Sequence, residues 1–577
     1  MLTRLLGLET EYAIRFQPAE GCRRPGNRAI YDALAAAVGS IVQTLPGERR
    51  SVEQARVFTE SGASLCYESF PDTPDGGLCE AGTPECRGPS QLLCHQKALD
   101  ALLVQALPAC AEALARSGYP GEVGLLKNCR DAEGHIYGAQ ENYEAVVGRG
   151  LDLWAYRAAL ALSLPLVAIE LALMVALVAA ILLPLVIFMV VVIAFMILGG
   201  ERGRALADRL FSDDGRFRRG LARVLRPLEV VLFRPLATLT TQPFRLAFRR
   251  QRRVMLAFLA SRPILTGAGT LGDDDAFGLS EKGPSIDRVV RATARPHERA
   301  LFETGNLTKD LHAPLSLRIR PLLGLFRARQ RMQLGLSDSN VAQVAEYLKI
   351  GTTALVLDMA EAGVIDDAPR LVDPLAALKA IAADPTLSAR VPVASGPPQT
   401  ALDLSRFYLD RARRFVREAP VVSLEAQAVV RAWEEALDAL AKDPGRLVGE
   451  LDWVTKRWLI EACCHVGGDP ASPAAGAPAD LTHAAKKKID LRYHELGSGY
   501  LARLERAGIA RAVVSAEEIR AATTTPPGNT PARLRGQLIR DLGRSTAEVS
   551  VSWDSVRIGG RLRGKVIRLR GAPSNDG

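Results

Sequence analysis

The stretch Gly7-Leu8-Glu9-Thr10-Glu11-Tyr12-Ala13-Ile14 decides the fold of this chain. In a β-strand, Glu9 and Glu11 lie on the same face, two residues apart. Two carboxylates on one face repel each other unless a cation lies between them. Paired in this way, they are hard oxygen ligands for a Mg²⁺ ion that bridges nucleotide phosphates. An exposed edge strand with solvated glutamates is the alternative interpretation of this fragment.

More acidic and polar residues follow. Glu68, Glu80 and Glu85 fall within 18 residues of one another. A second strand would bring such acids opposite the first pair, which favours the metal interpretation. Further along, residues 137–143 carry Gln140 and Asn142. Their amides suit hydrogen bonds to a nucleotide, although polar residues at strand edges serve a structural role equally well.

The ordered set of motifs resembles one known family, the Pup (prokaryotic ubiquitin-like protein) ligases and Pup depupylases/deamidases. These belong to the glutamine-synthetase-like carboxylate–amine ligases. The matching segments are GLETEYAI (7–14), VFTESGASLCYE (57–68), CEAGTPEC (79–86), LLKNCRDAEGHIYGAQENY (125–143), LTGAGT (265–270), SDSN (337–340), YLKIGTTALVLDMAEAG (347–363), LDWVTKR (451–457), IDLRYHEL (489–496), PPGNTPARLRG (526–536) and SWDSV (552–556).

The resemblance implies an enzyme that binds ATP and Mg²⁺ on a curved sheet. Ligases of the family phosphorylate the C-terminal glutamate of Pup and pass it to a substrate lysine, whereas depupylases cleave that isopeptide bond or deamidate a terminal glutamine. Mg²⁺ would neutralise the phosphate charge, and a carboxylate would act as base or nucleophile. Pup or Pup-conjugated proteins are the implied partners, and the proteasome system is a further one.

The family's functional residues are carried over position by position. Glu9 and Glu80 match metal ligands, and Glu11 joins them from the strand argument above. Glu68 falls where the family has its catalytic aspartate. The nucleotide contacts carried over are Thr83, Asn142, Arg331 and Trp553.

The chain departs from the family pattern at several of these positions. Glu68 is one methylene longer than aspartate, which would misplace the reacting oxygen by about 1 Å and cost roughly 100-fold in rate. Ser64 replaces a nucleotide-binding arginine, and Cys66 replaces a metal-contacting tyrosine. Gln140 and Gln333 occupy positions where metal-binding histidines are typical.

The branch of the family stays open. YLKIGTTALVLD and SWDSV look more like the depupylase side, whereas the short spacing from Glu9 to Glu68 is that of ligases. The hypothesis is therefore a Pup-processing amidohydrolase, with a Pup–protein ligase as the alternative. The departures also favour a second class of function, a non-catalytic membrane adaptor that keeps the fold. A ligase for a small amino acid or peptide is the third.

Composition excludes several classes of protein. The 577 residues and 62.2 kDa suffice for roughly two to four domains. With 48% hydrophobic and 24% charged residues the chain is not disordered, and nine cysteines are too few for a disulfide scaffold. The mean hydropathy of +0.06 is high for so charged a chain, which indicates that the apolar residues are concentrated in one place.

That place is residues 158–198, where Glu170 is the only formal charge. A straight helix of this length would measure about 60 Å, twice the thickness of a bilayer core. We therefore predict a transmembrane hairpin over 158–199, broken near Leu183-Pro184, with both flanks cytoplasmic at the inner membrane. Glu170 would need a partner or a cavity in lipid. A buried central helix of a soluble protein is the alternative.

Residues 200–253 follow with fourteen arginines, no lysine and five acids. Their net charge of +9 equals that of the whole chain. Arginines interleaved with leucine, valine and phenylalanine predict an amphipathic segment on an anionic membrane surface. An ordinary solvated basic helix is the alternative, and no nucleic-acid partner is expected because no recognised binding motif accompanies the charge.

The predicted fold class is α+β. A glutamine-synthetase-like curved antiparallel sheet with helices is interrupted by the membrane hairpin and followed by a small C-terminal domain. Residues 96–117 and 341–363 predict amphipathic helices. The predicted parts are a catalytic domain in two pieces (1–157 and 254–496), the hairpin (158–199), the Arg-rich segment (200–253) and the C-terminal domain (497–577).

Overall fold

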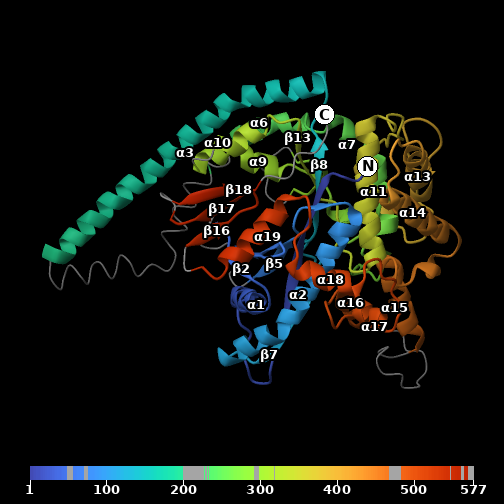
Figure 1. The fold of residues 1–577 in the computed structure, drawn as a ribbon, viewed down its shortest axis with the longest axis horizontal. Coiled ribbons are helices and arrows are strands. Elements are labelled where there is room, and N and C mark those ends of the chain that lie inside the picture. The colour runs from blue at the N-terminus through green and yellow to red at the C-terminus, as the bar shows by residue number, and fades with distance from the viewer. Residues whose placement is uncertain are drawn as a thin grey trace.

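The computed structural model describes residues 1–48, 56–69, 76–198, 227, 231, 233–291, 298–316, 319–466, 482–545, 548–560 and 564–569. Its centre is an eleven-stranded sheet with the order β11-β12-β13-β8-β1-β5-β4-β3-β2, to which β6 and β7 add by pairing with β1 (Figure 1). The strands are β1 Leu5–Pro18, β2 Thr44–Pro46, β3 Arg56–Thr59, β4 Ser64–Ser69, β5 Gly77–Gly82, β6 Cys86–Arg87, β7 Gly121–Leu126, β8 Gln140–Val146, β11 Arg288–Val290, β12 Ala300–Glu303 and β13 Arg329–Leu334.

The pairing confirms the predicted antiparallel sheet with one exception. Strands β11 and β12 run parallel, so the sheet is mixed. Smaller sheets lie outside it: β9 Thr270–Leu271 with β10 Phe277–Gly278, β14 Arg390–Val391 with β15 Gln399–Thr400, and the three strands β16 Val549–Val551, β17 Ser555–Ile558 and β18 Lys565–Arg568.

Strand β1 shows why the sheet has one buried face. Leu6, Leu8, Thr10 and Tyr12 are buried, and the residues between them are only partly buried, as the two-residue period of a strand requires. The buried face packs on helices α1 Asn27–Ile41 and α2 Pro89–Arg116. The opposite face of β1 therefore carries the two glutamates of the N-terminal stretch.

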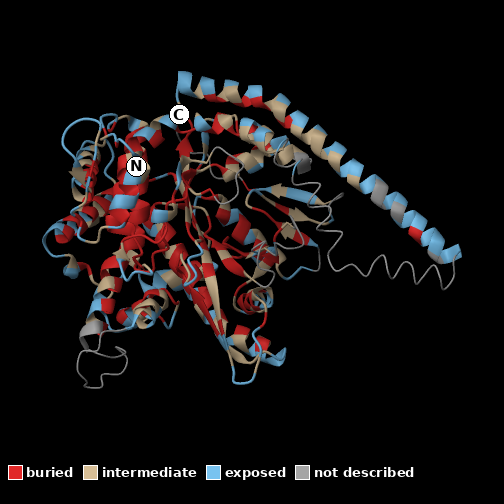
Figure 2. Cartoon of the chain, turned by 180° about the vertical axis from the view of Figure 1, so that it is seen from behind, coloured by how far each residue is buried: buried red, intermediate tan, exposed pale blue. Residues whose placement is uncertain are grey.

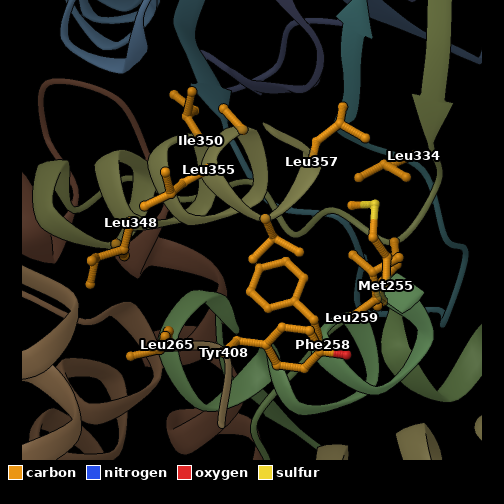
Figure 3. Packing of buried hydrophobic residues seen from close by; sticks show 14 of the residues in the cluster. Met255, Phe258, Leu259, Leu265, Leu334, Leu348, Ile350, Leu355, Leu357 and Tyr408 are labelled. Atoms are coloured by element: carbon orange, nitrogen blue, oxygen red, sulfur yellow. The ribbon is translucent and has the colours of Figure 1, made fainter. Parts of the chain in front are cut away.

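A second layer of helices packs beside the first. Figure 3 shows side chains from α7 Arg249–Ser261, α11 Gln343–Ala362 and α13 Ala401–Arg417 meeting the strand residue Leu334 in one apolar core. The remaining helices are α3 Leu151–Leu198, α6 Arg234–Thr240, α8 Pro263–Thr266, α9 Gly305–Leu311, α10 Ile319–Gly324, α12 Pro374–Ala382, α14 Leu424–Lys442, α15 Asp452–Val466, α16 His483–Tyr493, α17 Tyr500–Arg506, α18 Ala516–Thr524 and α19 Pro531–Leu542. Short 3₁₀ turns are η2 Gln242–Arg245, η3 Gly283–Ser285, η4 Ala313–Ser316 and η5 Pro444–Leu447.

The predicted hairpin is wrong in its geometry. Helix α3 is one continuous helix through Pro184, with no break at Leu183-Pro184. Proline removes one backbone hydrogen bond, but the helix continues through the leucine, alanine and valine residues before and after it. The two apolar stretches therefore form a single rod rather than two antiparallel arms.

The two halves of α3 have different surroundings. Tyr156, Leu160, Ser163 and Val167 are buried at helical spacing, so one face of the first half docks on the body of the protein. Glu170 has the partner that it was predicted to need, because His312 Nε2 lies 3.0 Å from its carboxylate. The second half extends beyond the body and is exposed over most of its surface (Figures 1 and 2).

The Arg-rich segment is also divided. Residues 200–226 lie outside the described residues. In contrast, Phe244, Phe248 and Arg252 are buried, and α7 lies in the main core. The prediction of a membrane-surface segment is therefore wrong for 244–253, because Phe244, Ala247 and Phe248 lie in the main apolar core and α7 packs against α11, α12 and α13.

The predicted C-terminal domain does not form a separate core. Helix α19 and strand β16 share an apolar cluster with Leu45 of β2 and Phe58 of β3. Helix α18 packs on α2 instead. The last part of the chain thus extends the main body at two places, one of which is the end of the sheet next to the acidic residues.

Candidate active site

One face of the central sheet collects the predicted site residues. Because side chains alternate along each strand, cross-strand neighbours form rows across this face. One row is Arg56 (β3), Cys66 (β4), Glu80 (β5) and Glu11 (β1). The next row is Phe58 (β3), Ser64 (β4), Gly82 (β5), Glu9 (β1) and Gln140 (β8).

The acidic residues lie close enough to change one another's protonation. Burial raises the pKa of Glu11 to about 7, with the charge of Glu80 adding to the rise and the Gly138 N–H opposing it. Burial and the charge of Glu9 raise the pKa of Glu80 to about 7. Burial also raises the pKa of Glu68, and the charge of Glu11 adds to the rise. A bound cation would reduce the repulsion between these carboxylates and so stabilise their charged forms.

Two arginines supply part of the missing positive charge. Arg56 Nη2 lies 3.1 Å from Glu80 Oε1, and Arg331 Nη1 lies 3.5 Å from Glu9 Oε1. Each arginine reaches across one intervening strand, from opposite ends of the cluster. Arg331, a predicted nucleotide contact, therefore pairs with a predicted metal ligand, and Arg56 is a charged residue that the sequence interpretation missed.

The predicted nucleotide contacts differ in their surroundings. Asn142 is 8% exposed and its Oδ1 has no hydrogen-bond partner among the described residues, which is the condition of a buried group that a ligand satisfies. Thr83 is buried, and its Oγ1 accepts a hydrogen bond of 3.0 Å from the Leu8 N–H. The hydroxyl of Thr83 therefore already joins the residue that follows β5 to β1, which is a structural role.

Trp553 lies at the edge of the acidic cluster. Its ring meets Phe58 edge-on, at 5.2 Å between centroids, and the Arg535 guanidinium lies 4.7 Å from its centroid. A Cβ atom at Gly82 would come within 3.1 Å of both the Trp553 ring and Ser64 Oγ. The absence of a side chain at Gly82 thus lets the indole lie against the sheet, one residue from Glu9 in the row.

Two of the predicted departures have a structural consequence. Gln333 Nε2 donates a hydrogen bond to Gln140 Oε1, so these two amides satisfy each other at the positions where the resemblance implies histidines. Burial raises the pKa of Cys66 to about 11, which keeps the thiol protonated near neutral pH. A protonated thiol is a poor ligand for a hard cation.

The remaining acids fit a divalent cation by their chemistry. Glu9, Glu11 and Glu80 offer carboxylate oxygens that repel one another. Within the part of the chain that the structure describes, no three acidic, histidine or cysteine side chains already converge on one point. The ion pairs of Glu9 and Glu80 with the two arginines account for this spread.

Glu85 lies apart from the acidic cluster, whereas Glu68 belongs to it. Glu85 pairs with Arg535 at 3.1 Å and so joins the segment between β5 and β6 to α19, away from the other acids. Glu68 lies on β4 opposite Leu78 and within electrostatic range of Lys309 on α9. Lys309 lies far from the recognised motifs, so only the folded chain reveals its proximity.

Known proteins match nearly the whole chain. The sequence profile of the Pup-ligase protein family covers residues 4–557. A Pup–protein ligase of Acidimicrobium ferrooxidans is 28% identical over 572 residues, 98% of this chain and 94% of that protein. A Pup deamidase/depupylase of Mycolicibacterium smegmatis is 32% identical over 308 residues, 52% of this chain and 56% of that protein.

Solved structures agree in fold. The ligase PafA in its complex with Pup superposes with a TM-score of 0.65 at 19% identity, over 99% of this chain and 90% of PafA. PafA in complex with ADP gives a TM-score of 0.61 at 20% identity, over 92% and 89% of the two chains. The sequence profile, together with these relatives, shows that the chain belongs to the Pup-ligase family of enzymes.

Proposed function

We propose that this protein is an ATP- and Mg²⁺-dependent Pup–protein ligase, which joins the C-terminal glutamate of Pup to a substrate lysine. The observation that carries the proposal is the sheet face on which Glu9, Glu11, Glu68 and Glu80 lie within electrostatic range of one another. Trp553 packs against Gly82 of β5, and the amide oxygen of Asn142, which has no partner among the described residues, lies on β8, on the other side of β1.

The ligase direction has more support than depupylation. The relative matched over 98% of this chain is a ligase, whereas the depupylase match covers 52%. The preference for an amidohydrolase, which rested on two short motifs, has no support in these matches. The short spacing between Glu9 and Glu68 is also that of ligases, so we adopt the alternative as the proposal.

Each step assigns a task to the chain's own residues. Asn142 and Trp553 would hold the nucleotide, and Glu9, Glu11 and Glu80 would hold Mg²⁺, which supplies neutralisation of phosphate charge. Transfer of the γ-phosphoryl group to the Pup carboxylate gives an acyl phosphate. Glu68 would take a proton from the lysine ammonium, whose nitrogen then attacks the acyl carbon as phosphate leaves. The raised pKa of Glu68 makes its carboxylate a better base.

The test offers the full chain three sets of substrates. These are Pup ending in glutamate with ATP and a lysine-bearing protein, a Pup conjugate, and Pup ending in glutamine. We expect conjugate formation with ADP release in the first set and loss of it in Glu68→Gln. Glu112→Gln, at an exposed acid near the end of α2, is the matched control and should behave as wild type. Absence of turnover in all three sets, with nucleotide binding intact, would contradict the proposal.

A membrane adaptor without catalysis is the second candidate. The Gln140–Gln333 hydrogen bond favours it, because it replaces two metal ligands of the family pattern with a self-satisfied pair. In this case Glu68→Gln would leave Pup and nucleotide binding unchanged, and wild type would form no conjugate. Any measurable turnover that Glu68→Gln removes would eliminate the adaptor.

We further propose that the second half of α3 attaches the enzyme to the cytoplasmic face of the inner membrane. Residues 175–198 carry no charge and span about 36 Å at the rise of an α-helix, more than a bilayer core. The exposed fractions of Leu183 and Val190 are 64% and 60%. Water would surround these side chains unless lipid covers them.

The chain's path restricts how α3 meets the bilayer. Both Leu151 at its start and α6 after it are attached to the same body. The segment between α3 and α6 is too rich in arginine to cross back through lipid. We therefore expect α3 to enter one leaflet as a monotopic element, with both flanks on one side, instead of crossing once.

Vesicle flotation of the full chain tests this attachment. Leu183→Lys/Val190→Lys should abolish flotation with vesicles that contain anionic lipid. The matched control is Val421→Lys/Val422→Lys, at two residues that are 76% and 67% exposed elsewhere on the body. Equal flotation of the two double variants would refute attachment through α3.

A further inference from the structure

Arg56 holds a central place on the site face. It is the first residue of β3 and lies opposite Cys66 of β4. Its Nη1 donates a hydrogen bond to Ser64 Oγ at 3.1 Å, and its Nη2 donates one to Glu80 Oε1 at 3.1 Å. A guanidinium has five N–H donors in a planar fork, which is more than these two contacts use.

Neutralisation of Glu80 is the first explanation of this arginine. The side chain of Arg56 is 28% exposed, and the charges of Glu80 and Glu9 help to hold it in its protonated form. A residue with this role alone would stabilise the folded protein and would have no preference among nucleotides and nucleosides.

The position of Arg56 favours a second role. On one side of it lies Ser64, next in its row to Gly82, against which the Trp553 ring packs. On the other side lies Glu80, a proposed metal ligand. A nucleotide with its base near Trp553 and its phosphates near the carboxylates would pass its phosphate chain between these groups. A guanidinium suits this place because it binds phosphate oxygens with two parallel hydrogen bonds.

The small side chain of Ser64 makes the arrangement possible. Arg56 reaches over β4 at this residue, and the hydroxyl of Ser64 accepts one of its hydrogen bonds. A long side chain at 64 would occupy the same space, since Arg56 Nη1 already lies 3.1 Å from Ser64 Oγ. The positive charge at this place therefore comes from Arg56 on β3, one strand away from residue 64 of β4, which lies in the row of Gly82 and Glu9.

We propose that Arg56 is a phosphate-binding residue of the nucleotide site. Its guanidinium is held ready by Ser64 and Glu80, and it donates hydrogen bonds to phosphate oxygens when a nucleotide binds. The inference rests on the proposed function, because it assumes that the sheet face binds a nucleoside polyphosphate. It adds a residue from outside the motif segments to that site.

The experiment compares a ligand that has phosphates with one that lacks them. Binding of ADP with Mg²⁺ is measured by calorimetry, and binding of adenosine is measured by ligand-observed NMR, for the full chain. Arg56→Gln should weaken ADP binding by about 10- to 100-fold, the range for a lost hydrogen bond to a charged group, and leave adenosine within about twofold. Arg56→Lys should keep part of the ADP affinity, since it keeps the charge without the fork.

A relocation variant and a control sharpen the test. Arg56→Gln/Ser64→Arg moves the guanidinium one strand over, and we expect it to recover most of the ADP affinity that Arg56→Gln loses. Arg116→Gln, at an exposed arginine 4.0 Å from Glu112, should bind both ligands as wild type does. Thermal melting of each variant checks that it is folded. If Arg56→Gln does not fold, Arg56→Lys takes its place in the comparison of ADP with adenosine.

Two results would overturn the inference. One is an ADP affinity of Arg56→Gln within about twofold of wild type, and the other is equal weakening of ADP and adenosine, the result expected of a purely structural arginine. A wild-type chain that binds no ADP would instead remove the proposed function together with this inference. Wild-type binding and turnover with an unaffected Arg56→Gln would remove the role of Arg56 alone.

Discussion

Glu11 and Glu80 are directly opposed residues of the antiparallel pair β1 and β5. Burial raises the pKa of both carboxyl groups to about 7, and the charge of Glu80 adds to the rise at Glu11. Two such acids side by side destabilise a protein unless they serve a ligand, because like charges in cross-strand pairs repel. Their pairing is the physical reason to place a cation-dependent reaction at this part of the sheet.

Replacement of Glu11 by Gln should stabilise the metal-free protein at alkaline pH. A folded pKa near 7, above the unfolded value of 4.5, means that the favourable contribution is complete below 4.5 and is lost as pH rises to 7. At pH 8 we expect Glu11→Gln to gain about 1–3 kcal/mol in the free energy of unfolding, and at pH 4.5 almost nothing. Urea unfolding in EDTA measures both, and the same gain at the two pH values would contradict this explanation.

Mg²⁺ should reverse the order of stability. Wild type should gain thermal stability on addition of the ion at pH 8, because a bound cation offsets the repulsion between the acids. Glu11→Gln should gain less, since it has lost one of the proposed ligands. Equal shifts in melting temperature for the two proteins would show that Glu11 is not a ligand.

Replacement of Glu68 by Asp should raise the rate of conjugation. Glu68 places its carboxylate one methylene further from β4 than aspartate would, within electrostatic range of Glu11 and Glu80. If about 1 Å of misplacement costs about 100-fold, the shorter side chain should recover up to that factor in kcat. Steady-state kinetics with Pup and ATP measure it, with Glu68→Gln as the inactive reference. A slower Glu68→Asp would mean that the site has adapted to glutamate.

Replacement of Gly82 by Ala should disturb Trp553. The added Cβ would lie 3.1 Å from the indole and 3.1 Å from Ser64 Oγ, so one of them must shift. We expect a cost of about 1–3 kcal/mol in stability, as for overpacking, and weaker binding of adenosine because the indole moves. Tryptophan fluorescence and the adenosine titration check both effects. Gly305→Ala, where no atom lies within 4 Å and φ is not positive, is the matched control.

The docking of α3 should depend on pH through His312. Burial alone would lower the pKa of His312, but its hydrogen bond with Glu170 and the charge of that carboxylate raise it above 6.5 overall. The contribution is therefore complete below pH 6.5 and is lost as pH rises through the higher folded value. Hydrogen-exchange protection of the docked half should fall by about 1 kcal/mol over this range in wild type. His312→Gln should show no such fall, and an unchanged pH dependence in this variant would exclude the ion pair as its source.

Much of the fold and of the site follows from local patterns. The two-residue period of β1 places Glu9 and Glu11 on one face of any sheet that the strand joins. Glu80 of β5 then lies opposite Glu11. Helices α2 and α11 lie where apolar spacing predicted them. In contrast, Arg56 and Lys309 lack any local signal, because their roles depend on which strands and helices become neighbours.

The sequence by itself determined the strand with its paired acids, the family of the enzyme and a long apolar segment in its middle. Local periodicity and the order of motifs are sufficient for these. Only the tertiary structure decided that this segment is one helix docked by its first half, that the four arginines within 249–253 belong to a core helix, and that two guanidinium groups flank the acids. The reason is physical: burial and ion pairing depend on contacts between residues far apart in the chain, and composition alone does not specify those contacts.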